Sequence, residues 1–246
     1  MLPLLVGRAT RAVSLLPCHD KAYTATLRFG YRSDTLDVWG QVESTGSALP
    51  TEEAIDAALP AFRGEIMQVP PMVSALKKDG VRLYDLARQG VEVEREARPV
   101  TIYRLEKRGY DPVAGELTLD YHCSAGTYIR TLCDDLGRTL GCGAVMIALR
   151  RTMAAGYTLE ESHTLEQVQA QGEALLRPVD TLFRQHPAYH ITHPRVEQLC
   201  RNGNAFTVKT PLDGGIYRVY GTEGDFLCLS RLENGQMTSI KNFFGA

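Results

Sequence analysis

A strict alternation of apolar and polar side chains between residues 21 and 30 constrains the fold more than any other feature of the sequence. Every second residue of this run is apolar (Tyr23, Ala25, Leu27 and Phe29), and the residues between these four are polar. Successive side chains of a strand point to opposite faces, so the pattern predicts a strand with one face in a core. Two more alternating runs, at residues 99–109 and 116–123, predict further strands.

Helices are expected between these strands. Thr51 is a helix cap, because two acids follow it in what would be the first turn. Residues 127–140 carry large apolar side chains at intervals of four, which predicts an amphipathic helix. Shorter helices are expected at residues 82–89, 164–174 and 177–182. Residues 66–80 contain two prolines and a glycine and are predicted to be a loop with short extended pieces.

The pattern changes after His186-Pro187. Short β-rich segments separated by Gly, Asp and Asn-Gly turns follow, at 205–209, 215–221, 225–231 and 236–240. Asn234-Gly235 is the strongest hairpin signal in the chain. The sequence therefore predicts a mixed α/β domain over residues 1–187 and a small β-rich domain over residues 188–246.

Composition excludes little. A chain of 246 residues, of which 44% are hydrophobic, can build one large domain or two smaller ones with a sizeable core. A net charge of -2 argues mildly against a strongly basic nucleic-acid binder, but a local basic face remains compatible with it. The six cysteines show neither a C-x-x-C pair nor zinc-finger spacing, so no metal site is expected. No secretory signal or long apolar span is visible, which predicts a cytoplasmic protein with no membrane segment.

Residues 124–130 (Ser-Ala-Gly-Thr-Tyr-Ile-Arg) connect an expected strand to an expected helix. Gly126 permits a tight turn or the close approach of a ligand, and the free N–H groups of a helix start favour an anion. The alternative is a purely structural junction in which Arg130 pairs with Asp134 one turn later. Taken alone, these residues favour the structural interpretation.

Other candidate residues also have two interpretations. Tyr23 is either a core tyrosine or a residue that contacts a ligand, and its hydroxyl needs a partner in both cases. Leu149 is either a core residue before the solvated pair Arg150-Arg151 or part of a binding surface. The proline-containing loop that leads to Lys77 is either an ordinary surface loop or a contact for phosphate.

Seven sequence blocks, read together and in order, resemble the bacterial TruB family of tRNA pseudouridine synthases. One such block would be weak evidence, but seven in the family's order over about the first 150 residues make coincidence implausible. The blocks are Lys21-x-Tyr23, Asp34-Thr35-x-Asp37-x-x-Gly40, Gln68-x-Pro70-Pro71, Ser74-Ala75-Leu76-Lys77, Gly80-x-Arg82-x-Tyr84-x-x-Ala87-Arg88-x-Gly90, Cys123-Ser124-x-Gly126-Thr127-Tyr128-Ile129-Arg130, and Leu140-Gly141-Cys142-Gly143-Ala144 with Leu149-Arg150-Arg151.

The resemblance implies an α+β fold, in which a mixed, mainly antiparallel sheet forms a catalytic domain of the pseudouridine synthase type. The C-terminal β-rich piece is similar, more faintly, to the small PUA-type RNA-binding domain. The implied activity is isomerisation of the T-loop uridine at position 55 of tRNA to pseudouridine, in which the uracil is detached, rotated and reattached through carbon. The resemblance implies no cofactor and no metal, the T-arm of tRNA as partner, and a monomer.

The resemblance also assigns roles to individual residues. Tyr23 would stack on the target base and take part in proton handling, while Tyr128 and Leu149 would line the uridine pocket. Arg130 would pair with the catalytic aspartate and hold it in place. These residue types suit the chemistry, because an extruded base needs flat aromatic and apolar walls, and an arginine keeps a carboxylate ionised and oriented. Candidate contacts to the RNA backbone are Lys21, Lys77, Arg150 and Arg151.

One departure from the family pattern concerns the nucleophile. The family's aspartate lies in a Gly-Thr-Leu-Asp-Pro stretch that directly precedes a sequence like residues 2–10 of this chain, so the aspartate and an upstream histidine are expected to fall before Met1. Thr35-Leu36-Asp37 is not a substitute, because it follows Tyr23 and matches a different block. Asp134 and Asp135 are not substitutes either, because they match helix positions of the family pattern.

Three hypotheses follow from the missing nucleophile. The chain is part of a pseudouridine synthase whose start is misassigned, a non-catalytic tRNA-binding or tRNA-folding protein, or an unstable fragment. The chain as printed is expected to form negligible pseudouridine, because a lost nucleophile removes several orders of magnitude of rate. Arg130 is expected to have a vacant pairing position that faces solvent or a bound anion.

Overall fold

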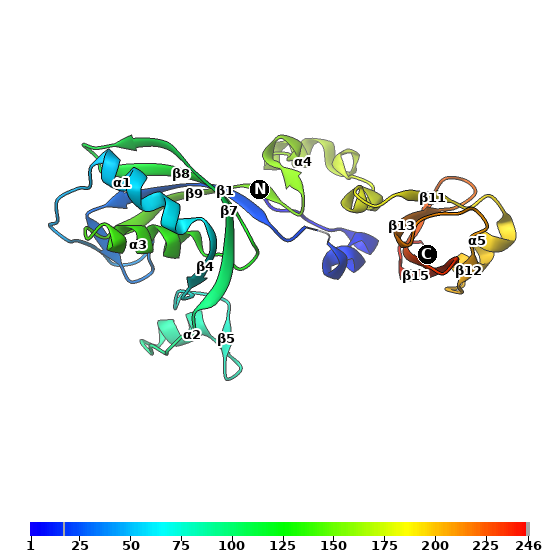
Figure 1. The fold of residues 1–246 in the computed structure, drawn as a ribbon, viewed down its shortest axis with the longest axis horizontal. Coiled ribbons are helices and arrows are strands. Elements are labelled where there is room, and N and C mark those ends of the chain that lie inside the picture. The colour runs from blue at the N-terminus through cyan, green and yellow to red at the C-terminus, as the bar shows by residue number, and fades with distance from the viewer. Residues whose placement is uncertain (17, 245–246) are drawn as a thin grey trace. The chain divides into compact units, whose positions relative to one another are not determined.

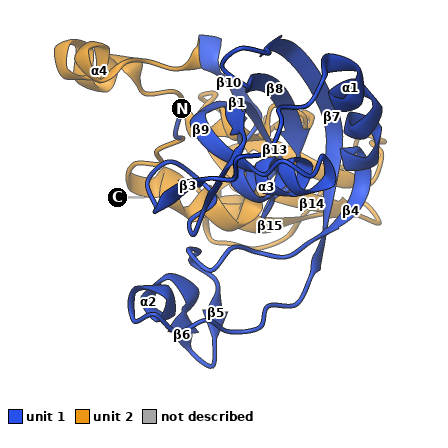
Figure 2. Ribbon diagram, turned by 90° about the vertical axis from the view of Figure 1, so that its left-hand side faces the viewer, with its two compact units in different colours: residues 1–2, 19–160 blue, residues 3–18, 161–246 orange. Residues whose placement is uncertain are grey.

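The computed structural model describes residues 1–16 and 18–244. Its contacts divide the chain into two units (Figure 2). The first unit contains Met1–Leu2 and His19–Glu160, and the second contains Pro3–Cys18 and Glu161–Ala246. The packing therefore groups residues 161–187 with the β-rich region. The assignment of residues 1–187 and 188–246 to separate functional domains stays a prediction.

A six-stranded sheet in which every neighbouring pair is antiparallel forms the centre of the first unit. It agrees with the expected mainly antiparallel fold. In their order across the sheet, the strands are β10 (Tyr157–Thr158), β9 (Ala144–Ala154), β1 (Lys21–Phe29), β8 (Glu116–Cys123), β7 (Arg98–Asp111) and β4 (Gly64–Gln68).

Strand β1 confirms the alternation in the sequence. Ala25, Leu27 and Phe29 are at most 2% exposed and belong to the main hydrophobic core. Helices α1 (Glu52–Ala58) and α3 (Ile129–Thr139) contribute apolar side chains to the same core and lie on one side of the sheet (Figure 1). The core residues thus join the sheet to both helices.

Two local signals explain where these helices begin and how closely they pack. The Thr51 hydroxyl accepts a hydrogen bond from the Ala54 N–H at 3.3 Å, as its cap position predicts. Gly137, inside α3, lies so close to the start of β9 that a Cβ there would be 2.3 Å from the Ala144 nitrogen. Because position 137 has no side chain, α3 can lie directly against β9.

Strand β9 is the main element that the sequence did not predict. It pairs with β1 along its length, and two register shifts interrupt the pairing. Its residue Leu149 lies opposite Ala25 and is 46% exposed, so the interpretation of Leu149 as a core residue is wrong. The strand is hard to recognise because its central residues do not alternate between apolar and polar types.

A long excursion leaves the sheet between β4 and β7 and projects away from it (Figure 1). The excursion, residues 69–97, contains the hairpin of β5 (Lys77–Lys78) and β6 (Val81–Arg82), followed by helix α2 (Leu83–Arg88). Its helix agrees with the expected one. The predicted loop over residues 66–80 begins too early, because the residues up to Gln68 pair with β7.

A second excursion, residues 34–41, lies between strands β2 (Tyr31–Ser33) and β3 (Val42–Ser44), which pair with each other. Within it, Asp37 forms a parallel bridge with Met146 of β9. This short loop is therefore fastened to the central sheet, whereas the excursion of residues 69–97 projects from it.

The second unit contains a five-stranded sheet with its own apolar core. The expected Asn234-Gly235 hairpin is confirmed, with positive φ at both residues. The strands are β11 (Ala188–His190), β13 (Gly215–Tyr220), β14 (Phe226–Glu233), β15 (Gln236–Asn242) and β12 (Phe206–Thr207), in their order across the sheet.

Helices of the second unit only partly match the expectation. The expected helix over residues 164–174 is α-helical as α4 (Leu165–Gln171), and the one over 177–182 is the 3-10 helix Val179–Phe183. Helix α5 (Pro194–Arg201) and the 3-10 helix Gly7–Leu15 were not predicted. Across residues 1–16 and 18–244, no helix is long and apolar enough to cross a bilayer.

Candidate active site at the start of helix α3

The turn that precedes α3 is held by two side chains. Gly126 has a φ of 85°, which allows the chain to reverse between β8 and α3. The Ser124 hydroxyl accepts the Thr101 N–H at 2.9 Å, and Gln68 forms a reciprocal pair with the backbone of Tyr128, at 2.8 and 3.1 Å. Because Gln68 occupies the Tyr128 N–H, that group is not free for an anion, in contrast to the general expectation for a helix start.

Arg130 is the residue that this turn positions. Its Nη1 donates to Oδ2 of Asp37 at 3.2 Å, and its Nη2 donates to the Val73 carbonyl oxygen. The Arg130 side chain is 19% exposed and that of Asp37 is 10% exposed. Arg130 thus already contacts one acid of this chain, but the contact is not bidentate, so the expectation of a vacant pairing position now concerns only its other N–H donors. The physical reason for the pair is the bridge between Asp37 and Met146, which brings a carboxylate 93 residues away in sequence to the start of α3.

Asp37 has both of its carboxylate oxygens engaged. Its Oδ1 accepts the Thr35 hydroxyl at 2.7 Å and the Trp39 N–H at 3.1 Å, while Oδ2 accepts from Arg130. A buried carboxylate that accepts three hydrogen bonds is well suited to orient a guanidinium. It is poorly placed to attack a substrate, which is compatible with the expectation that Thr35-Leu36-Asp37 does not act as the nucleophile.

The structural interpretation of Arg130, a pair with Asp134, does not hold. Asp134 instead accepts from Nε of Arg138 at 2.7 Å, one turn later in α3. Burial raises the pKa of both Asp134 and Asp135, with the charge of Arg138 opposing the rise in each. The Arg130 guanidinium therefore points away from the helix's own acids and toward the loop that carries Asp37.

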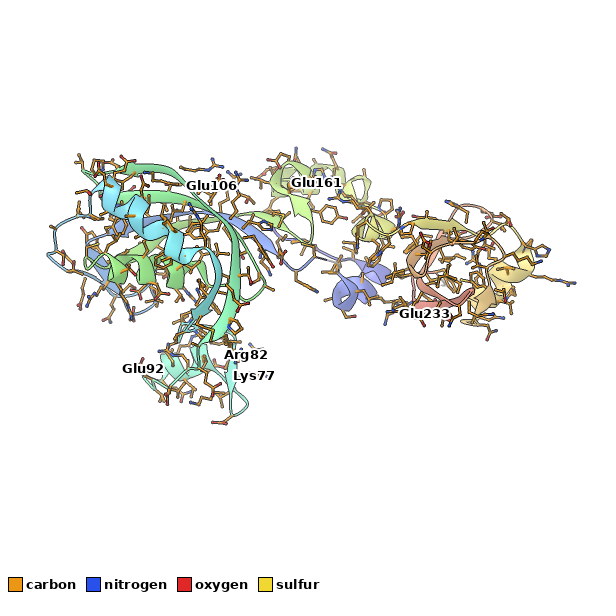
Figure 3. All side chains as sticks on the ribbon, viewed as in Figure 1. Lys77, Arg82, Glu92, Glu106, Glu161 and Glu233 are labelled. Carbon is orange, nitrogen blue, oxygen red and sulfur yellow. The ribbon has the colours of Figure 1, made fainter. Side chains whose placement is uncertain are left out.

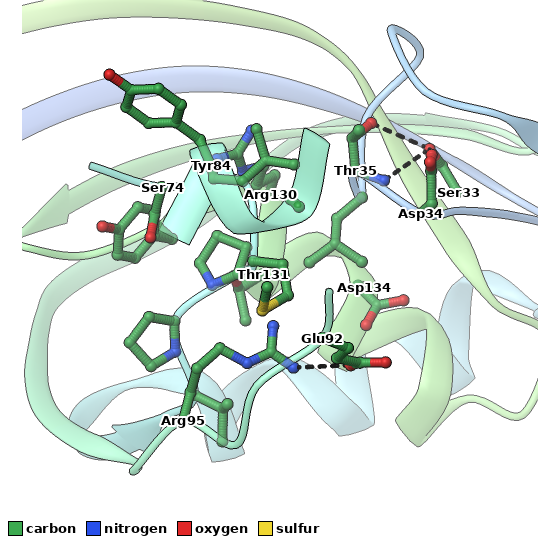
Figure 4. Close-up of a pocket in the computed structure, with 18 of the residues that line it drawn as sticks. Ser33, Asp34, Thr35, Ser74, Tyr84, Glu92, Arg95, Arg130, Thr131 and Asp134 are labelled. Atoms are coloured by element: carbon green, nitrogen blue, oxygen red, sulfur yellow. Dashed lines mark hydrogen bonds and ion pairs between the residues drawn. The ribbon is translucent and has the colours of Figure 1, made fainter. Parts of the chain in front are cut away.

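A cavity of about 1160 Å³ lies beside these residues. The cavity wall includes Tyr128, Arg130 and Thr131 of the turn and helix, residues 33–36 of the short loop, and residues 69–75 and 90–92 with Arg95 of the excursion (Figure 4). Four arginines and four acids line it, so the cavity as a whole is not strongly charged. Those residues are Arg88, Arg95, Arg130, Arg138, Asp34, Glu92, Asp134 and Asp135.

Three polar atoms in this wall have no hydrogen-bond partner among the described residues: Ser74 Oγ, Thr131 Oγ1 and Arg95 Nε. Ser74 is 6% exposed and Thr131 is 5% exposed. A buried polar group without a partner lowers stability, and a ligand that hydrogen-bonds to it removes that cost. Because these atoms are almost inaccessible, a ligand with its own donors and acceptors can reach them only if the side chains turn toward the cavity.

Tyr23 and Leu149 line a different concavity, of about 550 Å³, along β1, β8 and β9. Burial raises the pKa of the Tyr23 hydroxyl, and a hydrogen bond from Arg151 together with its charge opposes that rise. The hydroxyl therefore has a polar partner although its ring packs against the main core. The structure brings Tyr128 and Arg130 into one cavity, and Tyr23 and Leu149 into the other.

Two family profiles and several named proteins match the sequence of this chain. The profile of the TruB family pseudouridylate synthase N-terminal domain matches residues 1–129, and that of the tRNA pseudouridylate synthase B C-terminal domain matches residues 130–184. The chain is 41% identical to the tRNA pseudouridine synthase B of Cupriavidus metallidurans over 96% of its length and 79% of that protein. The corresponding protein of Chromobacterium violaceum is 45% identical over 85% of this chain and 72% of its own length. The chain belongs to the TruB family.

Solved structures support the fold of this TruB family member. A chain in the crystal structure of a Cbf5-Nop10-Gar1 complex superposes with a TM-score of 0.65, covering 97% of this chain and 71% of its own. A chain of an H/ACA RNP bound to a substrate RNA superposes with a TM-score of 0.64. The sequence identities are 21% and 19%, so these two comparisons establish the architecture only.

The basic residues expected to contact RNA lie in different surroundings in this TruB family member. Lys21 donates to the His19 carbonyl oxygen at 3.1 Å, and Nε of Arg151 donates to the Met1 carbonyl oxygen at 2.7 Å. Arg150 lines the concavity of Tyr23, whereas Lys77 lies on the projecting excursion (Figure 3). Their contacts to an RNA backbone stay a prediction.

Two site residues had no role assigned from the sequence. Asp37 and Gln68 both fall within blocks that resemble the family, yet their spacing gives no sign that one holds Arg130 and the other holds Tyr128. Their partners lie 93 and 60 residues away. Within the described part of the chain, no cluster of three or more His, Cys, Asp or Glu side chains could hold a metal ion.

Proposed function

We propose that this protein belongs to the machinery that converts the uridine at position 55 of the tRNA T-loop to pseudouridine. The observation that carries the proposal is the partly buried Arg130, held by the buried Asp37 at the wall of a cavity that Tyr128 also lines. The relatives in the comparison are named tRNA pseudouridine synthase B, and they cover almost the whole chain.

The reaction requires positioning rather than a cofactor. The bond between uracil N1 and ribose C1′ breaks, the base turns over, and C5 bonds to C1′ while the C5 proton is lost and N1 gains one. Atoms and electrons balance within the nucleotide, so no oxidant or reductant takes part. A cavity that receives an extruded base next to an aromatic side chain suits this chemistry.

Arg130 has the capacity to hold a second carboxylate. A guanidinium has five N–H donors, and Asp37 and Val73 are its hydrogen-bond partners among the described residues. The remaining donors can orient the nucleophilic aspartate of the family, which we expect not to be among the residues of this chain. In this proposal Asp37 fixes the arginine, and the arginine in turn fixes the nucleophile.

We retain Tyr23, Tyr128 and Leu149 as residues that contact the target base. An exposed leucine on a sheet offers apolar surface to a ligand, and the Tyr23 hydroxyl is half-buried beside Arg151. Because Tyr23 and Leu149 line a concavity of their own, the base would contact both sets of residues only when RNA is bound. This dependence is part of the proposal.

Further parts of the proposal concern partners and place. We propose that residues 188–246 are a PUA-like RNA-binding domain, and their separate apolar core is compatible with an independent role. The T-arm is the expected RNA element, and Lys21, Lys77, Arg150 and Arg151 are the expected backbone contacts. We expect the protein to act as a monomer in the cytoplasm.

RNA binding without isomerisation is the second candidate function. The observation that favours it is the full engagement of Asp37, the carboxylate that contacts Arg130, by hydrogen bonds within the protein. Such a protein would capture or refold the T-arm and leave the uridine unchanged.

A T-arm RNA hairpin labelled with tritium at uridine C5 tests both candidates. We expect the chain as printed to bind the hairpin in a salt-dependent manner and to release no tritium. Adding the family's Gly-Thr-Leu-Asp-Pro stretch ahead of Met1 should produce tritium release, and Arg130→Ala in that extended protein should abolish it. Arg28→Ala, which removes a partly exposed arginine of β1 that lines neither cavity, is the control.

The outcomes separate the two candidates. If the extended protein binds the hairpin but releases no tritium, binding alone is the function. If neither protein binds in a salt-dependent manner, both candidates fail. Tritium release by the chain as printed would contradict the expectation that its nucleophile is absent.

A further inference from the structure

Trp39 is the single tryptophan of the chain and is 91% exposed. A tryptophan in this position gains almost nothing from apolar burial, although indole is among the side chains that gain most from it. Exposure alone identifies no site, since Val113 is equally exposed and Leu165 is 83% exposed. What distinguishes Trp39 is the way in which its backbone is held.

The loop that carries Trp39 is fixed on both sides of the residue. The Val38 N–H donates to the Met146 carbonyl oxygen at 3.1 Å, and the Met146 N–H donates to the Leu36 carbonyl oxygen at 3.1 Å. After the tryptophan, a Cβ at Gly40 would lie 2.1 Å from Oδ1 of Asp34, so this position must be glycine for the loop to close as it does. The indole is therefore presented from a rigid backbone.

The same loop is connected to the candidate active site. The Asp37 carboxylate accepts the Trp39 N–H with one oxygen and the Arg130 guanidinium with the other. Leu36 lines the cavity, and three residues of backbone span at most about 11 Å, so Trp39 lies near the rim of the cavity. A ligand that is larger than the cavity and extends past Leu36 can therefore reach the indole.

The surroundings of Trp39 favour a neutral, flat ligand. No ring pair or cation–π contact among the described residues involves Trp39, so its faces are not used within the protein. The neighbouring carboxylates of Asp34 and Asp37 disfavour a phosphate at this place. An unpaired nucleobase has a π-face and no charge, and bases of single-stranded RNA stack on exposed aromatic side chains.

We propose that Trp39 is a base-stacking residue that receives an unpaired nucleobase of the RNA next to the uridine held in the cavity. This inference rests on the proposed function. It adds a contact outside the cavity that would select RNA in which the reacting uridine is followed or preceded by another unpaired base. Because the backbone around Trp39 is already ordered, stacking loses little conformational freedom.

The fluorescence of the chain tests the proposal directly, because Trp39 is its one tryptophan. We expect a T-arm hairpin to quench the emission of Trp39 as a base stacks on the indole. A fully paired duplex with the sequence of the same stem should leave the emission unchanged. Binding of each RNA is measured in parallel by the anisotropy of a label on the RNA.

Variants measure how much the contact contributes. Trp39→Ala should weaken hairpin binding about 5- to 150-fold, the range for the loss of a stacked base, and Trp39→Phe should retain most of the affinity. Val113→Ala removes an equally exposed apolar side chain elsewhere and should not alter binding. Urea unfolding of Trp39→Ala should match that of the unsubstituted chain, since the side chain has almost no packing contacts.

Each other result overturns the inference. Hairpin binding by anisotropy with no change in Trp39 emission, or with unchanged affinity in Trp39→Ala, would mean that no base stacks there, and the proposed function would stand. Equal quenching by the paired duplex would indicate proximity to RNA without a base contact. Absence of salt-dependent hairpin binding would remove the proposed function and this inference together.

Discussion

The two walls of the cavity are built in different ways. On one wall, the loop of residues 34–40 and the start of α3 are joined to the central sheet, and Asp37 and Arg130 hold each other across it. On the other wall, the excursion of residues 69–97 forms its ion pair locally, between Arg95 and Glu92 three residues apart. The first wall is therefore preorganised by a contact between distant residues, whereas two of the three polar atoms without a partner, Ser74 Oγ and Arg95 Nε, lie on the second.

This difference indicates how such a site can combine precision with adaptation. A group that orients a nucleophile must stay within a fraction of an ångström, which requires support from the packed sheet. A surface that receives RNA gains from polar groups that have no partner until the RNA arrives. The contact of Arg130 with the Val73 carbonyl oxygen is where the first wall meets the second.

The largest expected effect is a difference in unfolding free energy between two single variants, each of which removes one carboxylate from one wall. Asp37→Ala leaves the partly buried guanidinium of Arg130 without its carboxylate and the Trp39 N–H without its acceptor, and should lower the free energy of unfolding of the first unit by about 3 kcal/mol. Glu92→Ala removes an ion pair whose carboxylate is mostly exposed, at 80%, and should cost at most about 1 kcal/mol. Urea unfolding of both variants measures the two values, and equal losses would contradict a difference between the walls.

A smaller effect is expected from adding one methyl group to an element that supports each wall, α3 for the first and the β5–β6 hairpin for the second. Gly137→Ala places a Cβ 2.3 Å from the Ala144 nitrogen, so α3 must move away from β9, at a cost of about 1–3 kcal/mol despite the better helix propensity of alanine. Gly80→Ala meets no atom within 4 Å but has a φ of 81°, so only local strain of about 1 kcal/mol is expected.

The two glycine variants also differ in what they disturb. Gly137→Ala should weaken the contribution of Arg130 to the free energy of unfolding, because α3 carries both residues and shifts. Gly80→Ala should leave that contribution unchanged. A double-mutant cycle of each glycine variant with Arg130→Ala measures the coupling energy between the two positions. Coupling found only in the Gly80→Ala cycle would mean that the excursion, and not α3, fixes Arg130.

The smallest expected effect is on the pH dependence of stability. Burial raises the pKa of Asp134 above the ordinary value of 3.8, so the folded chain keeps this proton at pH values where the unfolded chain has released it. The stabilisation is present below pH 3.8 and is lost as the pH rises through the folded pKa. Asp134→Asn should remove this part of the slope. Urea midpoints between pH 3.5 and 7 give the measurement, and an unchanged slope would show that Arg138 cancels the effect of burial.

Local structure was predictable where a signal and its consequence lie within a few residues. The alternation from Tyr23 to Phe29, the cap at Thr51 and the Asn234-Gly235 turn each correspond to the expected element. Strand β9 was not predictable, because Leu149 and its neighbours do not alternate and their pairing with β1 contains two register shifts. Helix α5 was missed among short β-rich segments.

The candidate site was predictable in its residues and less so in its arrangement. The resemblance to the TruB family selected Arg130 and Tyr128, and both line the cavity. The same resemblance placed Tyr23 and Leu149 in that pocket, whereas they line a concavity of their own. It did not anticipate that Asp37 would take the position next to Arg130.

The sequence by itself determined the family, the strands whose side chains alternate, and the turn from Gly126 into α3. These follow from local periodicity and from the order of short motifs, which the chain carries without reference to distant residues. Only the tertiary structure decided that Asp37 holds Arg130 and that the loop presents Trp39 to solvent. The physical reason is that a hydrogen bond between residues 93 apart depends on how the strands pair, and neither spacing nor composition encodes that pairing.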